Sequence, residues 1–355
     1  RSSDLVFALC GALCYGELGA RFPRAGGEYV FLSESFGKPV GFLSGWISLI
    51  VGFSAPIAAA SVAFAGYTFR AFAIPAGQPV QFTAFGTNLA FLSPLSLTAI
   101  GAVVLFSLVH YHSIHIGSRI QNALTLFKIG IVLTFILAGI FAGDGSAANF
   151  RKSAEIPFSA EKFAVALIFV SFAYSGWNAA GYMGGEIVRP GKNIPISLIA
   201  GTVIVICFYL FLNFVYIFAL PPAEMTGVLE IGAKSAVSLF GDNISRLFSG
   251  AVALGILSVL SAMIMTGPRI YYAMSRDGIF FSIFGRLNID RKTPASSIFL
   301  QAGIAVLMVV SASFDALLLY IGFTLSLFAM LTVIGLMKLR ITGGGAEPEY
   351  KTFGY

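Results

Sequence analysis

Long apolar runs separated by short polar connectors dominate this chain. Runs of about 20 apolar residues, the length of helix that crosses ~30 Å of hydrocarbon, lie at approximately 4–20, 40–70, 94–112, 120–142, 161–185, 196–220, 246–273, 295–312 and 315–338. The connectors between them are rich in turn residues, as in Ala20–Gly27 and Arg189–Pro195. The pattern predicts an all-α, polytopic membrane protein with a single transmembrane domain over residues 1–355.

The basic residues indicate how these spans are oriented. When the connectors are assigned alternately to two sides, fourteen Lys and Arg residues fall on one side and seven on the other, and Lys128 lies inside a span. Connectors rich in Lys and Arg face the cytoplasm. We therefore expect Arg1 outside and Tyr355 inside. An outside N-terminus without a signal sequence favours a further helix before Arg1.

One predicted span carries polar and small residues at its centre. Ser171–Asn178 reads SFAYSGWN inside an apolar segment. Lipid cannot satisfy the backbone groups that a break in this helix would free, so a break there indicates a site lined by protein, as in many secondary transporters. The predicted substrate-binding residues are Phe172, Ala173, Tyr174, Ser175, Gly176, Trp177 and Asn178. The alternative is a continuous helix whose small residues only permit close packing.

Lys128 is the second unusual residue of the predicted spans. It lies nine residues beyond Arg119, which on a helix places it ~13 Å further into the membrane. An ammonium at that depth costs at least ~2.5 kcal/mol unless it is partnered or neutralised. Lys128 could fill a cation site or carry a proton, or it could simply tie helices together through their carbonyl groups.

Other polar residues are weaker candidates. Glu17 and Glu186 end their spans near Arg21 and Arg189, and they could form gate or anchor ion pairs or be ordinary interfacial charges. Ser261 belongs to a polar strip on the seventh span that could face a cavity or bond back to its own helix.

Composition narrows the class of function. The chain is 57% hydrophobic and 11% charged, and its mean hydropathy is +0.87, whereas about 25% of residues are charged in ordinary globular proteins. The net charge of +6 comes from single basic residues in connectors, which disfavours a nucleic-acid partner. No metal or cofactor is predicted, because the cysteines lack metal spacing and His110, His112 and His115 point in different directions on a helix. Without a Walker A motif or a nucleophile elbow, we expect a transporter rather than an enzyme.

Several motifs together resemble one family, the amino acid permeases of the amino acid–polyamine–organocation (APC) superfamily, and in particular its L-amino acid transporter branch. The resemblance runs from Arg1 to Tyr355. The motifs are Cys14–Gly19 with Phe22–Tyr29, similar to the second helix; Phe172–Asn178 with Glu186 and Pro190–Pro195, similar to the sixth helix and its following loop; and Gly267–Arg269 with Ser275–Gly278, similar to the end of the eighth helix.

The resemblance implies a LeuT-like fold of five plus five inverted helices, in which this chain would hold helices two to ten and lack the first. It implies a substrate site between broken helices one and six. Lys128 would occupy the position of a coupling sodium ion, with Ser261 nearby on the eighth helix. That points to amino acid transport by alternating access, as sodium-independent exchange or proton-coupled uptake.

The family pattern also bears on partners and location. The connector between Arg70 and Ser93 lacks the cysteine by which animal members join a glycoprotein, so we expect no disulfide-linked subunit and a multi-pass protein of the plasma (bacterial inner) membrane. Three alternatives stay open: a carrier of polyamines or other organic amines, a receptor or sensor that binds amino acids without moving them, and a channel. The channel would need a polar stripe through several spans, and only the fifth and seventh spans hint at one. A receptor would be expected to carry a signalling domain, and this sequence contains no soluble segment long enough to form one.

Overall fold

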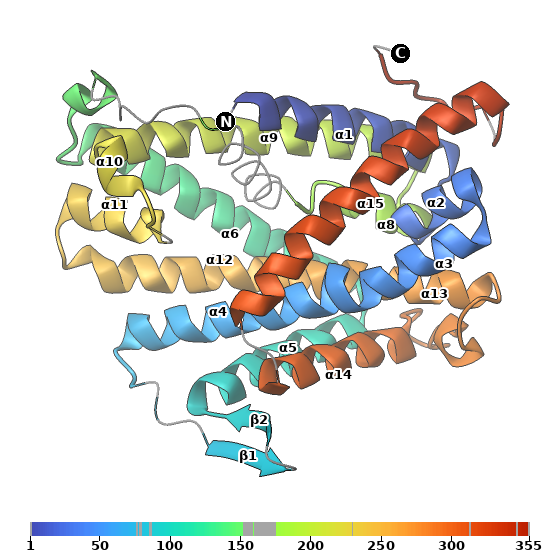
Figure 1. Ribbon diagram of the computed structural model, residues 1–355, viewed down its shortest axis with the longest axis horizontal. Coiled ribbons are helices and arrows are strands. Elements are labelled where there is room, and N and C mark those ends of the chain that lie inside the picture. The colour runs from blue at the N-terminus through green and yellow to red at the C-terminus, as the bar shows by residue number, and fades with distance from the viewer. Residues whose placement is uncertain are drawn as a thin grey trace.

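The computed structural model describes residues 2–75, 77, 80–84, 87–151, 159, 175–228, 230–311, 314–345 and 347–353. Over these residues the chain forms a bundle of helices with one β hairpin (Figure 1). The helices are α1 (Ser2–Arg21), α2 (Glu28–Phe36), α3 (Lys38–Ile47), α4 (Ala55–Phe72), α5 (Pro94–His112), α6 (Ile114–Phe141), α8 (Ala179–Tyr182), α9 (Pro190–Ala219), α10 (Pro222–Met225), α11 (Ile231–Phe240), α12 (Ile244–Thr266), α13 (Pro268–Arg276), α14 (Ala295–Ser311) and α15 (Phe314–Thr342). The antiparallel strands are β1 (Val80–Ala84) and β2 (Thr87–Leu92).

The all-α class predicted from the apolar runs is confirmed, and the hairpin is a small addition in the connector between α4 and α5. Within the described residues, five helical stretches are long and apolar enough to cross a membrane: Lys38–Phe72, Pro94–His112, Ile114–Phe141, Pro190–Ala219 and Ile244–Arg276. The predicted span 161–185 lies mostly outside the described residues.

Prolines mark where several of these helices begin. Helix α9 starts at Pro190, earlier than residue 196, because proline at the first helical position gives up only an N–H that has no partner there. Helix α13 starts at Pro268, directly after α12 ends. Pro94 opens α5, where the Ser93 and Ser96 hydroxyls reciprocally cap the backbone N–H groups of the first turn.

The outward faces of the long helices are apolar. On α6, for example, Leu126, Phe127, Leu133 and Leu137 are between 44% and 72% exposed. A continuous apolar surface of this kind is a liability in water, whereas hydrocarbon is the solvent it suits. The exposure pattern therefore agrees with helices that lie against lipid.

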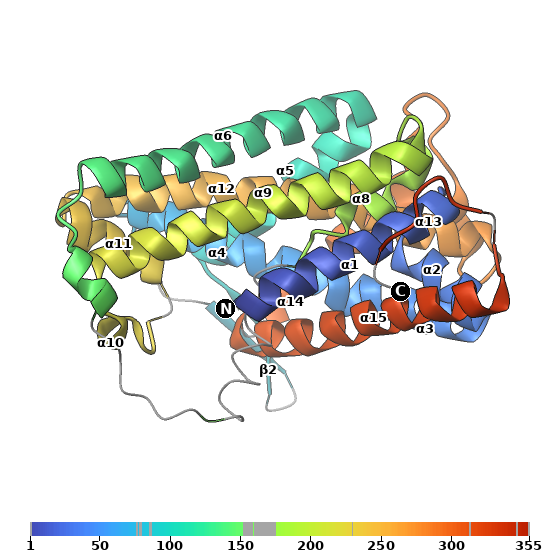
Figure 2. The same cartoon turned by 90° about the horizontal axis from the view of Figure 1, so that it is seen from above.

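The helices pack as two groups, which two further helices bridge. Helices α1, α8 and α9 form the first group, and α4, α5, α12 and α14 form the second. Helix α6 touches both α9 and α12, and α15 touches α1, α2 and α4. Figures 1 and 2 show α1 beside α9 and α4 beside α12 along the length of the molecule.

The two ends of the bundle differ. Helices α2, α3 and α13 lie at one end, and α10 and α11 lie at the opposite end (Figure 1). The orientation expected from the basic connectors makes the α2 end the cytoplasmic one, hereafter the inner end. A buried cluster there packs Tyr15 of α1 with Tyr29 and Phe31 of α2 and Tyr271 of α13.

Candidate functional site

The described part of the predicted break is not a regular α-helix. Ser175–Asn178 form turns, and Gly176 has a φ of 91°, a left-handed value that side chains rarely adopt. The chain then makes the single turn of α8 and a 3₁₀ turn at Gly184–Glu186 before α9 begins. Phe172, Ala173 and Tyr174 lie outside the described residues.

The backbone carbonyl groups of these turns are only partly used. The carbonyl of Gly176 accepts from the N–H of Ala179 at 3.1 Å, and that of Asn178 accepts from Gly181 at 3.0 Å. Among the described residues, no backbone N–H donates to the carbonyl of Ser175 or Trp177. Within the described part of the chain, these two acceptors beside the break have no backbone donor.

Trp177 anchors the break against α1. Its ring meets the ring of Tyr15 edge to face, with 4.6 Å between the ring centroids. A Cβ at Gly11 would lie 2.8 Å from the indole, so the missing side chain of Gly11 makes room for the tryptophan. Gly11 was not singled out from the sequence, since a glycine within an apolar helix gives no local signal of what packs on it.

Asn178 belongs to a buried polar cluster that joins the break to α2. Its amide donates to Glu28 Oε1 at 3.0 Å and to the Tyr182 hydroxyl at 3.2 Å. The hydroxyl of Tyr15 donates to the same Glu28 oxygen at 2.6 Å. Glu28 is 4% exposed, and burial raises the pKa of its carboxyl, although the hydrogen bonds from Tyr15, Asn178 and Tyr182 oppose that shift.

Lys128 packs against α12 and Ser261 lies on that helix, but no direct hydrogen bond joins the two side chains. The Lys128 stem packs beside Gly255 of that helix. Ser261 lies six residues, or about 9 Å, further along α12, fully buried, and pairs with Nε2 of His110 on α5 at 3.0 Å. Ser261 therefore faces α5, and His110 is a partner that the sequence did not reveal.

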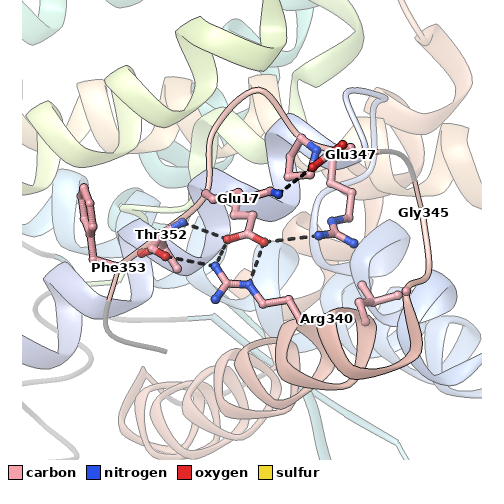
Figure 3. A pocket seen from close by; sticks show the side chains of 11 residues that line it. Glu17, Arg340, Gly345, Glu347, Thr352 and Phe353 are labelled. Atoms are coloured by element: carbon pink, nitrogen blue, oxygen red, sulfur yellow. Dashed lines mark hydrogen bonds and ion pairs between the residues drawn. The ribbon is translucent and has the colours of Figure 1, made fainter.

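Glu17 is the centre of an ionic network at the inner end. Its fully buried carboxylate accepts from Arg340 of α15, with Nε at 2.9 Å, and from Arg21 at 3.4 Å. The backbone N–H of Thr352 also donates to it at 2.9 Å. Figure 3 shows this carboxylate beside the Arg340 guanidinium. Both side chains line a cavity of about 620 Å³, which Gly345, Glu347 and Phe353 also line.

Glu186 forms a second inner ion pair, with a partner other than the one expected. Both of its oxygens accept from Arg269 of α13, at 2.9 and 3.1 Å. The expected neighbour, Arg189, is exposed instead, and its φ of 48° turns the chain into α9. The Arg269 side chain is only 4% exposed, whereas Glu186 is 28% exposed.

A third contact completes the inner end. Arg24 reaches both oxygens of Asp277, just after α13, at 3.0 and 2.9 Å, and the Tyr29 hydroxyl donates to the same carboxylate at 2.6 Å. These three contacts join α1, α2 and the segment before α9 to α13 and α15.

Comparison with known proteins identifies the family. A family model described as "Amino acid permease" matches residues 4–353. The chain belongs to the amino acid permease family. It is 28% identical to the b(0,+)-type amino acid transporter 1 of Mus musculus over 98% of this chain and 69% of the relative. It is 29% identical to the large neutral amino acids transporter small subunit 2 of Mus musculus, over 94% of this chain and 62% of the relative.

This membership agrees with the resemblance seen in the motifs. The permease is an integral, multi-pass membrane protein, and the family and relatives are transporters. Amino acid transport is therefore the function to which the non-helical segment, the helix groups and the inner ion pairs must be related.

Proposed function

We propose that this permease moves amino acids by alternating access and that the break around Ser175–Asn178 binds the substrate. The observation that carries the proposal is the turn at Gly176, with the carbonyls of Ser175 and Trp177 left without backbone donors among the described residues. Irregular backbone at membrane depth persists only where protein or a water-filled cavity surrounds it. A substrate ammonium is a natural donor for such carbonyl groups.

The substrate is proposed to be an amino acid that binds as a zwitterion. Carbonyl oxygens suit its ammonium, and the amino-terminal end of a broken helix suits its carboxylate. The aromatic face of Trp177, held in place by Tyr15, offers an apolar contact for the side chain. The names of the relatives point the same way, since they refer to amino acids and to large neutral amino acids.

Glu17 and Glu186 are proposed to be inner gate residues. Breaking a pair that leaves a buried charge costs about 3–5 kcal/mol, and the Arg269 side chain is 4% exposed. The Arg24–Asp277 pair is 42% and 27% exposed, and surface pairs contribute only ~0–1 kcal/mol. The pairs of Glu186 and Glu17 are therefore the ones whose opening should govern release to the inside.

Lys128 is proposed to set the coupling, with Ser261 in support. The lysine lies on a membrane-spanning helix against α12, where an ammonium can replace a coupling cation or release a proton. Exchange without sodium, or uptake with protons, follows from a fixed amine at that position. Ser261 would act indirectly, through α12. Lys128 packs against that helix at Gly255, whereas the Ser261 hydroxyl pairs with His110.

We further propose that the transporter works in the plasma (bacterial inner) membrane without a disulfide-linked subunit. The outer connector that precedes α5 holds the β1–β2 hairpin and contains no cysteine. Cys10, Cys14 and Cys207 all lie on helices α1 and α9, away from that connector in sequence.

Transport in liposomes tests the proposal directly. The full-length protein is reconstituted, and uptake and counterflow of labelled amino acids, and of polyamines as a separate arm, are measured with and without proton and sodium gradients. We expect exchange of amino acids that is unaffected by sodium. Binding without any uptake or exchange would point to the receptor alternative, and movement of polyamines alone would overturn the substrate class.

A further inference from the structure

A buried carboxyl group stands directly behind the break. Glu28 opens α2 and is 4% exposed. A single oxygen, Oε1, accepts from the Tyr15 hydroxyl of α1 at 2.6 Å and from the Asn178 amide at 3.0 Å. This one side chain therefore connects α1, α2 and the last residue of the break.

The surroundings of Glu28 contain donors rather than a cation. Among the described residues, no Lys or Arg forms an ion pair with it, and the neighbours that bond to it are Tyr15, Asn178 and Tyr182. A buried acid is costly unless it is hydrogen-bonded, and an apolar residue would satisfy packing alone at least as well. The carboxyl is therefore best explained by the groups that it holds in place.

The segment that Glu28 holds needs an external anchor. Gly176 has no side chain, and its φ of 91° is one of many values open to glycine. The turn by itself cannot keep the carbonyls of Ser175 and Trp177 in one direction. Asn178 follows immediately, so a fixed Asn178 side chain limits where the preceding carbonyls can point.

We propose that Glu28 is a positioning residue for the substrate site, whose carboxyl fixes Asn178 and so holds the carbonyl groups of the break in the geometry that binds the amino acid. The proposal rests on the proposed function of the break. Because Glu28 belongs to α2, at the inner end, the same contact links the geometry of the site to the state of the inner gate.

Exchanging the amide and carboxyl groups between positions 178 and 28 tests the proposal. The variants N178D, E28Q and the double variant E28Q/N178D are reconstituted, and the KM and Vmax of amino acid exchange are measured per inserted transporter. N178D places two carboxyl groups within hydrogen-bonding distance, and we expect it to raise KM by about tenfold, the effect of losing one such contact. E28Q keeps an acceptor oxygen for Asn178, so its KM should stay within about threefold of wild type.

The double variant decides the matter. In E28Q/N178D the amide and the carboxylate have changed places across the same contact, so KM should return to within about threefold of wild type. E28L, which offers no acceptor, should raise KM about tenfold even where less protein inserts. Thr293→Val is the matched control, because it removes a part-buried hydrogen bond of 3.0 Å to the Tyr111 carbonyl of α5, in the second helix group, and should leave KM unchanged.

Two results would overturn the proposal. One is a double variant no better than N178D, and the other is an E28L transporter that inserts in smaller amounts but binds its substrate with wild-type KM. A wild-type protein that exchanges no amino acid would contradict the proposed function instead. The two failures are therefore distinguishable in the same set of measurements.

Discussion

Glu186 and Arg269 form a two-pronged ion pair between the segment that follows the break and the first turn of α13, with Nε–Oε1 and Nη2–Oε2 distances of 2.9 and 3.1 Å. The pair connects the segment between the break and α9 to α13, and α13 directly follows α12 of the second helix group. Arg269 is almost completely buried there. Glu186 supplies its counter-charge, because the other acceptor of Arg269 among the described residues is the uncharged Met265 carbonyl.

Removing the charge of Glu186 should therefore open the inner side. Glu186→Gln leaves a buried guanidinium without a carboxylate, at a cost on the order of 3 kcal/mol to the closed state. We expect faster labelling of a cysteine introduced at Ser175 by a maleimide applied from the inner side, in a background without native cysteines. Glu34→Gln is the control, since Glu34 pairs with Arg24 at the surface. Equal labelling rates in the two variants would show that Glu186 is not a gate residue.

Glu17 should contribute strongly to stability as well as to gating. Glu17→Gln keeps the size of the side chain but removes the carboxylate that Arg340, Arg21 and the N–H of Thr352 share. We expect a loss of roughly 3 kcal/mol, seen as a lower melting temperature in detergent and faster proteolysis of the tail 347–353. Glu347→Gln, which breaks an exposed pair with Lys351, should melt like wild type. The role of Glu17 is refuted if the two variants melt alike.

The helices and the irregular backbone at Ser175–Asn178 could be predicted from the sequence because both are local properties. Lipid requires a run of apolar residues for each span, and a glycine between serine and tryptophan marks a weak point in such a run. The β1–β2 hairpin was not predicted, because the connector that holds it was expected to be an irregular, turn-rich segment. Its alternating apolar residues, as in Val80–Ala84, were the available signal.

The partners of the buried charges could not be predicted in the same way. Arg340 is 323 residues from Glu17, and Asn178 is 150 residues from Glu28. Nothing in a local pattern indicates which distant end will lie beside which. Nearness in sequence instead suggested Arg189 for Glu186, although the side chain that meets it belongs to α13. Glu28 lies in one of the family motifs, but no role could be assigned to it from the sequence, because only the fold brings it beside Asn178.

The buried carboxyl of Glu28 should give the protein a specific dependence of stability on pH. Burial raises the pKa of this group above its ordinary value of 4.5, so above that pH the native state holds a proton more firmly than the unfolded state. Its contribution to stability is then fully present at lower pH and is lost as the pH rises through the native pKa. Glu28→Gln lacks this loss. Melting temperatures measured from pH 4 to pH 8 should therefore rise for the variant relative to wild type as the pH increases. A constant difference would contradict the raised pKa.

Lys128 should be required for coupled transport. Lys128→Ala removes the ammonium from the surface where α6 meets α12, beside Gly255, and leaves any cation position there empty. We expect transport to be abolished, or to continue without response to the proton gradient, while the amount of inserted protein persists. Lys234→Ala is the control, since that exposed lysine bonds to the Glu224 carbonyl near α11. Unchanged kinetics in Lys128→Ala would reduce this lysine to a structural tie.

A substitution at Gly176 can separate the effect of backbone geometry on substrate binding from the effect of side-chain contacts. A Cβ at this position meets nothing within 4 Å, and φ is 91°, so Gly176→Ala adds only backbone strain, about 1–2 kcal/mol. If the turn presents carbonyl groups to the substrate, relaxing it should raise the KM of exchange about tenfold. Gly227→Ala carries the same strain at a φ of 75° in the connector before α11, and Gly303→Ala adds a methyl group to open space on α14. Both controls should exchange with wild-type KM, whereas a Gly176→Ala transporter that matches them would exclude this turn from substrate binding.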